Sequence, residues 1–200
     1  MRRIGLFLGL LAATGCNRKP PPELAGEITG VPLPAATARP SFVLTDLAGS
    51  PYDFKARTAG RLTLLFFGYV NCPDVCPATM ANIGSVTSQM LSAERDRIDV
   101  VFVTTDPERD SIPVLRQWLG RFDPAFIGLT GTVAEVEAAQ RAAGVSVAIR
   151  DTAKEAYTVS HAAQVLVYSP DDSGHVAYPF GTRQAEWAAD LPKLLERWRP

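Results

Sequence analysis

The stretch LTLLFFGYVNCPDVCP, residues 62–77, decides both the fold and the chemistry expected of this chain. It opens with a nearly continuous apolar run, Leu62 to Phe67, which predicts a central strand covered on both faces. Cys72 and Cys76 follow directly, and Pro77 suits the first turn of a helix expected to run to about residue 91. Because helical residues four apart lie on one face, the two sulfurs can meet at one soft metal ion or at each other.

A helix start favours the thiolate form of cysteine, because free backbone N–H groups and the positive end of the helix dipole lower the thiol pKa. Thiolate is the form that binds copper or zinc, and it is also the form that attacks disulfides. The spacing of Cys72 and Cys76 therefore leaves three interpretations open: a metal site, a redox pair or a structural disulfide. Such a disulfide would close a very small loop and would constrain little of the unfolded chain.

The rest of the chain predicts strands and helices in α/β order. A hairpin opens the domain, parallel strands with helical crossovers follow, and a second hairpin and a helix close it. Pro179 places the last strand at a sheet edge, and Thr132 with Glu135 predicts a capping box. This pattern predicts a thioredoxin-like fold with an N-terminal β-hairpin extension. The expected strands are 41–46, 62–67, 98–104, 126–129, 164–168 and 176–180, and the expected helices are 77–91, 111–122, 132–143 and 185–199.

The N-terminus predicts export. Arg2 and Arg3 precede a short apolar run, and small residues lead up to Cys16, as in a lipoprotein-type signal peptide over residues 1–15. Cys16 is then the expected lipidation site, with ordinary signal cleavage as the alternative. We therefore expect an exported protein that a lipid anchor holds at the periplasmic face of a bacterial membrane.

Composition limits the function further. Proline-rich residues 16–40 predict an extended, unpacked tether, which leaves residues 41–200 as a single domain. The formal net charge is -1, with 20 basic and 21 acidic residues scattered along the chain, so we expect no nucleic-acid partner. An exported pair of cysteines oxidises unless it is reduced or bound to metal, which predicts a thiol reductant as partner.

His161 precedes the terminal hairpin, in a loop that a thioredoxin-like fold places beside the start of the cysteine helix. Two thiolates with one imidazole suit Cu(I), and the imidazole also supports Cu(II). Four motifs follow one another between about Phe42 and Trp198: Gly68-Tyr69 before Cys72–Pro77, Asp106–Asp110, Ile127–Gly131 and His161. In these motifs the chain resembles the Sco/SenC copper proteins, which take part in assembling the copper A centre of cytochrome c oxidase.

The resemblance implies that Cys72, Cys76 and His161 are copper ligands. It also implies three partners: the copper A subunit of cytochrome c oxidase, a periplasmic copper donor and the membrane that holds the lipid anchor. One position departs from the family pattern, because Ser160 stands where the family often has Asp immediately before the histidine. A hydroxyl cannot supply the same charge next to the ligand, which puts the binding of Cu(II) in question.

Three functions remain open, and the sequence does not decide whether the chain is an enzyme. The first is a metallochaperone that exchanges copper with a partner site. The second is a thiol-disulfide oxidoreductase that uses Cys72 and Cys76 as its redox pair to reduce the cysteines of the oxidase copper subunit. The third is a peroxiredoxin-type peroxidase, which Cys76-Pro77 resembles, although Pro73 stands where that class has Thr.

Other polar and sulfur-containing side chains are expected to have structural roles. His175 is expected in an exposed hairpin turn, and Asp74 is expected to be a solvated loop acid. Asp106–Asp110 is expected to cap a helix and to form an Arg109 ion pair. Met80 and Met90 follow the apolar pattern of their helix and are expected in the core.

Overall fold

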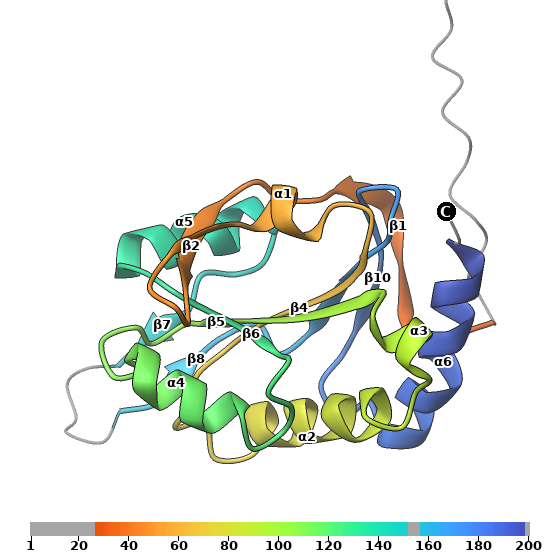
Figure 1. Cartoon of the computed structure of the whole chain (residues 1–200). Helices are drawn as coiled ribbons and strands as arrows, with labels where there is room; N and C mark the ends of the chain where they lie inside the picture. Colours follow the sequence, from red (N-terminus) through yellow and green to blue (C-terminus); the bar gives the residue numbers. More distant parts are fainter. Residues whose placement is uncertain (1–26, 152–156, 199–200) are drawn as a thin grey trace, which may run out of the picture.

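One eight-stranded sheet organises residues 27–151 and 157–198, the part of the chain that the computed structural model describes (Figure 1). The strand order is β1-β10-β9-β4-β5-β6-β2-β3, so β4 (Leu62–Gly68) lies near the middle. β5 (Ile98–Thr104) runs parallel to β4, and β6 (Ile127–Thr130) runs parallel to β5. The crossovers between these strands confirm the predicted α/β order.

The remaining strands flank this parallel centre. On one side, β9 pairs antiparallel with β4, and β10 and β1 follow it outward; on the other, the hairpin β2–β3 adds to β6. The arrangement confirms the predicted thioredoxin-like fold with its N-terminal hairpin. The bounds of these strands are β1 Val31–Ala38, β2 Val43–Asp46, β3 Pro51–Asp53, β9 Val165–Tyr168 and β10 Ser173–Tyr178.

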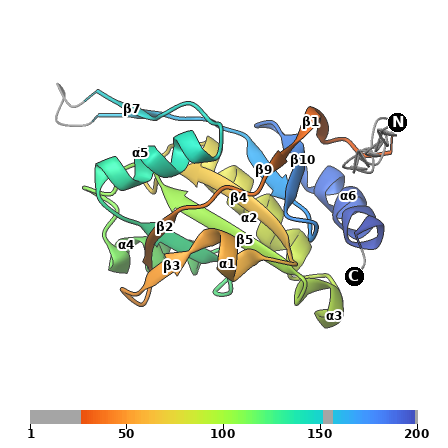
Figure 2. The same ribbon diagram turned by 90° about the horizontal axis from the view of Figure 1, so that it is seen from above.

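Helices cover both faces of the sheet (Figures 1 and 2). α2 (Val75–Thr87), α4 (Ile112–Leu119) and α6 (Gln184–Arg197) lie on one face, and α1 (Phe54–Thr58) and α5 (Val133–Ala142) lie on the other. The predicted capping box at the start of α5 is confirmed. Short α3, Ser92–Arg95, was not predicted, and neither were α1 and the two-residue strands β7, Ile149–Arg150, and β8, Val159–Ser160.

The side chains of β4 alternate between two hydrophobic clusters. Leu64 and Phe66 pack with α2, α4 and α6, whereas Leu65 and Phe67 pack with α1 and α5. All seven residues of β4 are buried, as predicted from the apolar run. Each fully buried large apolar side chain contributes about 1.5–3 kcal/mol, so this strand fixes the position of whatever follows it.

The N-terminal boundary of the domain differs from the prediction of an unpacked tether up to residue 40. β1 begins at Val31 and pairs antiparallel with β10. Its register shifts between Pro32 and Thr37, a stretch in which Pro34 has no N–H to donate. Prolines are tolerated in β1 because it is an edge strand. The expectation that Pro179 marks a sheet edge is wrong, because β10 is not the edge strand. It lies between β9 and β1.

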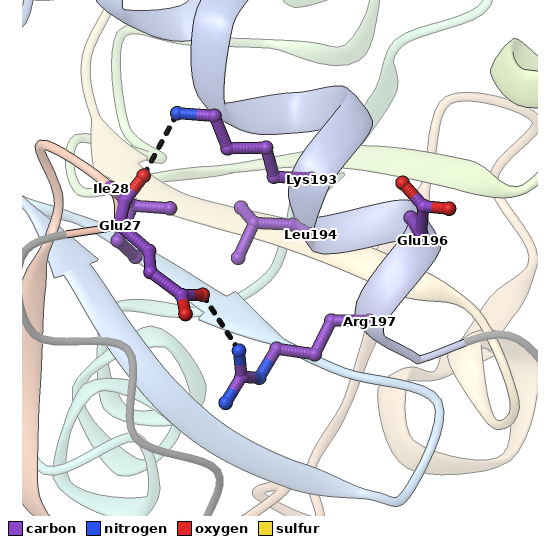
Figure 3. A pocket seen from close by; sticks show the side chains of 6 residues that line it. All are labelled: Glu27, Ile28, Lys193, Leu194, Glu196 and Arg197. Carbon is purple, nitrogen blue, oxygen red and sulfur yellow. Dashed lines mark hydrogen bonds and ion pairs between the residues drawn. The ribbon is translucent and has the colours of Figure 1, made fainter.

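The first described residues, Glu27 and Ile28, lie beside α6. The Glu27 carboxylate pairs with Arg197 at 2.7 Å, and the Glu27 carbonyl accepts a hydrogen bond from Lys193 at 2.8 Å (Figure 3). These residues line a surface pocket with Ile28 and Leu194. None of the predicted site residues lines it.

The predicted signal peptide, Cys16 and the tether up to residue 26 lie outside the described residues. Within residues 27–151 and 157–198, no helix has both the length and the apolar character required to cross a membrane.

Arg39, immediately after β1, is a buried cation that joins distant parts of the sheet. Its guanidinium donates to the hydroxyls of Thr58 and Thr63 at 2.8 Å and to the carbonyl oxygens of Arg61 and Ser169 at 3.0 and 2.9 Å. It also forms an ion pair with the carboxylate of Asp172 at 2.9 Å. Residue 39 is therefore part of the core, not of a tether.

Arg39→Ala is expected to lower the free energy of unfolding by about 3 kcal/mol, because two carbonyl groups lose their buried donor at about 1–3 kcal/mol each. Urea unfolding measures this loss. The matched control is Arg141→Ala, which removes a guanidinium that is 62% exposed and paired with Glu137. That exposed pair is worth about 0.3–0.5 kcal/mol. Equal losses in the two variants would contradict a structural role for Arg39.

Candidate metal centre

The site starts where β4 ends, and Gly68 makes it possible. A Cβ at this position would lie 2.7 Å from the Cys76 sulfur and 2.9 Å from the Phe102 ring. Glycine is therefore required for the first turn of α2 to lie this close to the end of the strand. The predicted helix begins at Val75, two residues earlier than expected, so that Cys76 lies inside its first turn.

Asp74 is the N-cap of α2. Its carboxylate accepts a hydrogen bond from the Val75 N–H at 2.7 Å and stabilises the helix end that carries Cys76. The expectation of a merely solvated loop acid is therefore corrected: Asp74 is exposed, but it caps the helix.

The two cysteines lie in contact at this helix start. The Cys72 sulfur accepts a hydrogen bond from the Cys76 N–H at 3.4 Å. Both are free cysteines; Cys76 is fully buried and Cys72 is 8% exposed. The helix N-terminus thus supplies a donor to Cys72, as expected from the sequence.

His161 lies beside this pair, although it is 85 residues from Cys76 in the chain. Its Nε2 is 3.5 Å from the Cys76 sulfur, and its Nδ1 is 3.0 Å from the carbonyl oxygen of Ala162. A carbonyl oxygen only accepts, so Nδ1 carries the proton and the lone pair of Nε2 faces the thiols. The rings of Tyr69 and Phe66 contact the imidazole edge to face, at centroid distances of 5.7 and 6.0 Å.

The structure therefore brings all three predicted site residues together. The ligand atoms of Cys72, Cys76 and His161 lie within 4.8 Å of one another. Two sulfurs and one imidazole nitrogen at this separation can converge on one soft ion with small side-chain movements. Thiolate ligands favour Cu(I) or zinc, and imidazole accepts copper in either oxidation state.

The two thiols differ electrostatically. The pKa of Cys72 is lowered, mainly by the hydrogen bond from the Cys76 thiol and also by backbone N–H groups. The pKa of Cys76 is raised, because it donates that hydrogen bond and because it is buried. At neutral pH the pair shares one proton, which Cys76 holds, and Cys72 is the thiolate.

The Asp106–Asp110 segment, between β5 and α4, lies next to the site. The predicted ion pair between Asp106 and Arg109 is confirmed. The predicted capping is wrong for Asp110: the carboxylate is fully buried and accepts from the Thr104 hydroxyl at 2.6 Å and from the Val70 N–H at 3.0 Å. Burial raises the pKa of Asp110. Its role was missed, because only the fold shows that the end of β5 meets the cysteine loop.

The remaining candidate residues are outside the site. His175 is buried, not exposed as expected; it is 3.0 Å from the Asp171 carboxylate and stacks on Trp198 at a centroid distance of 5.1 Å. Met80 is fully buried in the core cluster, and Met90 packs against that cluster, as predicted. Ser160 lies exposed in β8, directly before His161.

Known proteins are similar to this chain in sequence and in fold. A protein of Stutzerimonas stutzeri, provisionally named as copper-binding, is 32% identical over 169 residues, which cover 84% of this chain and 81% of that protein. Mitochondrial SCO1 of Saccharomyces cerevisiae is 31% identical over 157 residues, which cover 78% of this chain; the chain spans 52% of that protein's length.

Solved structures agree with these relatives. Bradyrhizobium japonicum ScoI with copper bound is 32% identical, covers 83% of this chain and 99% of its own, and has a TM-score of 0.68. BsSco, described as a member of the Sco family of cytochrome c oxidase assembly proteins, is 18% identical with a TM-score of 0.62 and so shows the fold alone. The family described as SCO1/SenC matches residues 31–196. The chain belongs to the SCO1/SenC family.

Proposed function

We propose that this chain is a copper metallochaperone that binds the metal through Cys72, Cys76 and His161. The observation that carries the proposal is the convergence of two thiols and one imidazole nitrogen within 4.8 Å. The copper-bound ScoI of Bradyrhizobium japonicum, with the same fold, supports copper as the cargo. Membership of the SCO1/SenC family supports the copper A site of cytochrome c oxidase, which the family resemblance implies, as the place to which the metal goes or which the protein matures.

The state of each ligand suits loading and release. Cys72 provides a thiolate before the metal arrives, Cys76 gives up its proton on binding, and the Nε2 lone pair of His161 is already directed at the pair. His161 is only partly buried, so a partner's ligand can reach the metal and replace the imidazole. A periplasmic copper donor and the copper A subunit are the proposed partners in this exchange.

A second function, thiol-disulfide exchange, is favoured by the electrostatic difference between the two thiols. A cysteine with a lowered pKa is a nucleophile at neutral pH, and the second thiol can then resolve the mixed disulfide. In that reaction Cys72 attacks a disulfide of the oxidase copper subunit and Cys76 releases the reduced partner. Cys72 and Cys76 are then left joined to each other in a disulfide, which a thiol reductant must reduce before the next reaction.

We further propose that Cys16 carries the lipid that holds the protein at the periplasmic face of the membrane. The small residues before Cys16 and the apolar run preceding them support this anchor.

X-ray absorption of the reduced, Cu(I)-loaded protein is expected to show two sulfur ligands and one nitrogen ligand. His161→Ala is expected to abolish Cu(II) binding and to weaken Cu(I) binding, because it removes the nitrogen ligand. Disulfide exchange should persist in that variant, because Cys72 and Cys76 remain. His175→Ala is the control, since that imidazole lies outside the site. Equal copper binding by His161→Ala and the wild type would reject the ligand set.

Alkylation of the reduced, metal-free protein by iodoacetamide is expected to reach half its maximal rate at Cys72 well below pH 8.5, the usual pKa of a free thiol. The thiolate fraction rises with pH, so a lowered pKa keeps Cys72 reactive at pH values where an ordinary thiol is protonated. Cys76→Ala is expected to move this midpoint upward, because it removes the largest cause of the lowering. A midpoint that stays fixed in Cys76→Ala would contradict the assignment.

The wild-type protein is expected in the membrane fraction, with a mature N-terminus at Cys16 that bears acyl chains detectable by mass spectrometry. Cys16→Ser is expected to lose the acyl chains, because the serine hydroxyl does not replace the thiol in the thioether bond. Cys72→Ser is the matched control and should keep them. A mature N-terminus elsewhere in the wild type would disprove the anchor.

A further inference from the structure

We propose that Asp106, Arg109 and Tyr157 form a clamp, here named the Tyr157 clamp, that positions His161 against the two thiols. The inference rests on the proposed copper function and adds to it three side chains that do not contact the metal themselves.

The strand that leads to His161 makes few strand contacts of its own. His161 follows β8, which pairs only with β7, through the contacts of Ile149 with Ser160 and of Arg150 with Val159. These two strands form a sheet separate from the main one, and Figure 2 shows β7 beside α5, at the edge of the domain. Two short strands alone are of marginal stability. The position of the imidazole therefore depends on contacts outside this pair.

The rings of Phe66 and Tyr69 supply some of these contacts. Tyr157, four residues before His161, supplies further ones. Its hydroxyl donates to the Asp106 carboxylate at 2.8 Å, and its carbonyl oxygen accepts from Arg109 at 3.1 Å. The Arg109 guanidinium carbon also lies 3.7 Å from the centroid of the Tyr157 ring. Backbone and side chain of Tyr157 are thus both held, by two charged groups that pair with each other.

The environment strengthens these contacts. Asp106 is fully buried, so its charge is poorly solvated and gains more from each hydrogen bond than an exposed carboxylate would. The backbone N–H of Asp106 donates to the Thr104 hydroxyl at 3.0 Å, which fixes the carboxylate relative to β5. The guanidinium of Arg109 over the ring adds a cation–π attraction to these hydrogen bonds.

The same loop also holds the sulfur side of the site. Asp110 accepts from the Val70 N–H, two residues before Cys72. The segment Asp106–Asp110 therefore touches the cysteine loop at one end and Tyr157 at the other. This segment therefore sets the distance between the sulfur ligands and the nitrogen ligand.

The test compares two variants that delete the same group. Tyr157→Phe removes the hydroxyl that binds Asp106 and keeps the ring under Arg109. Tyr178→Phe is the matched control, since it removes a hydroxyl that donates to buried Asp190 at 3.0 Å in a pair that contains none of the proposed ligands. Both are measured for thermal stability, Cu(II) affinity and nitrogen hyperfine coupling in the Cu(II) electron paramagnetic resonance spectrum.

Tyr157→Phe is expected to weaken Cu(II) binding by about tenfold or more, as is usual for residues that orient a metal ligand, and to alter the nitrogen coupling. Tyr178→Phe is expected to change only stability. In a His161→Ala background, Tyr157→Phe should have no further effect on Cu(I) affinity, because the clamp acts through the imidazole. Wild-type affinity and spectrum in Tyr157→Phe, or an undiminished Cu(I) effect without His161, would overturn the clamp.

If Tyr157→Phe does not fold, Arg109→Lys provides the second variant, since lysine keeps the charge but loses the planar fork. The same loss of Cu(II) affinity is expected there, and wild-type affinity would again overturn the clamp. The proposed function fails separately: a wild-type protein without two sulfurs and one nitrogen around copper removes the metal site itself, whereas an intact wild-type site with unchanged variants removes only the clamp.

Discussion

The close approach of the first turn of α2 to the end of β4 is the constraint on which the site depends. A side chain larger than hydrogen at Gly68 would occupy the space of the Cys76 sulfur. With that space open, the helix start brings its free N–H groups to Cys72 and leaves both sulfurs facing the segment of His161. The placement of the two sulfurs therefore depends on one packing contact.

The electrostatic difference between the two cysteines follows from the same contact. Cys76 is deeper, next to the strand, where burial penalises a negative charge, whereas Cys72 is closer to the surface and receives hydrogen bonds. One negative charge is thus shared by the two sulfurs. In the proposed copper site, binding of Cu(I) would add a positive charge and expel the second proton, so that two thiolates and one copper ion would leave a net charge of -1, no larger than that of the two sulfurs before binding.

The sequence was sufficient for the central elements and for the contact between Cys72 and Cys76, because their signals are local. The approach of His161 to this pair was expected instead from its place in the predicted fold and from the family resemblance. The apolar run of β4, the capping box of α5 and the spacing of Cys72 and Cys76 each reflect interactions within a few residues. The failures have the opposite origin. β1 and Arg39 look like a proline-rich tether until their distant partners are known, and His175 stacks on Trp198, which directly follows α6. The hydrogen bond between Asp110 and Val70 likewise joins residues that are far apart in the chain.

Metal binding and disulfide exchange compete for the same atoms. A disulfide requires the two sulfurs to approach to about 2.0 Å, which removes both thiolates from the ligand set. The oxidised protein would then offer only the His161 imidazole, which alone holds Cu(I) poorly compared with two thiolates. Electron exchange can therefore proceed only when the metal is absent. Under the proposed function a reductant would therefore belong to the copper cycle, because it would decide which of the two reactions Cys72 and Cys76 are able to perform.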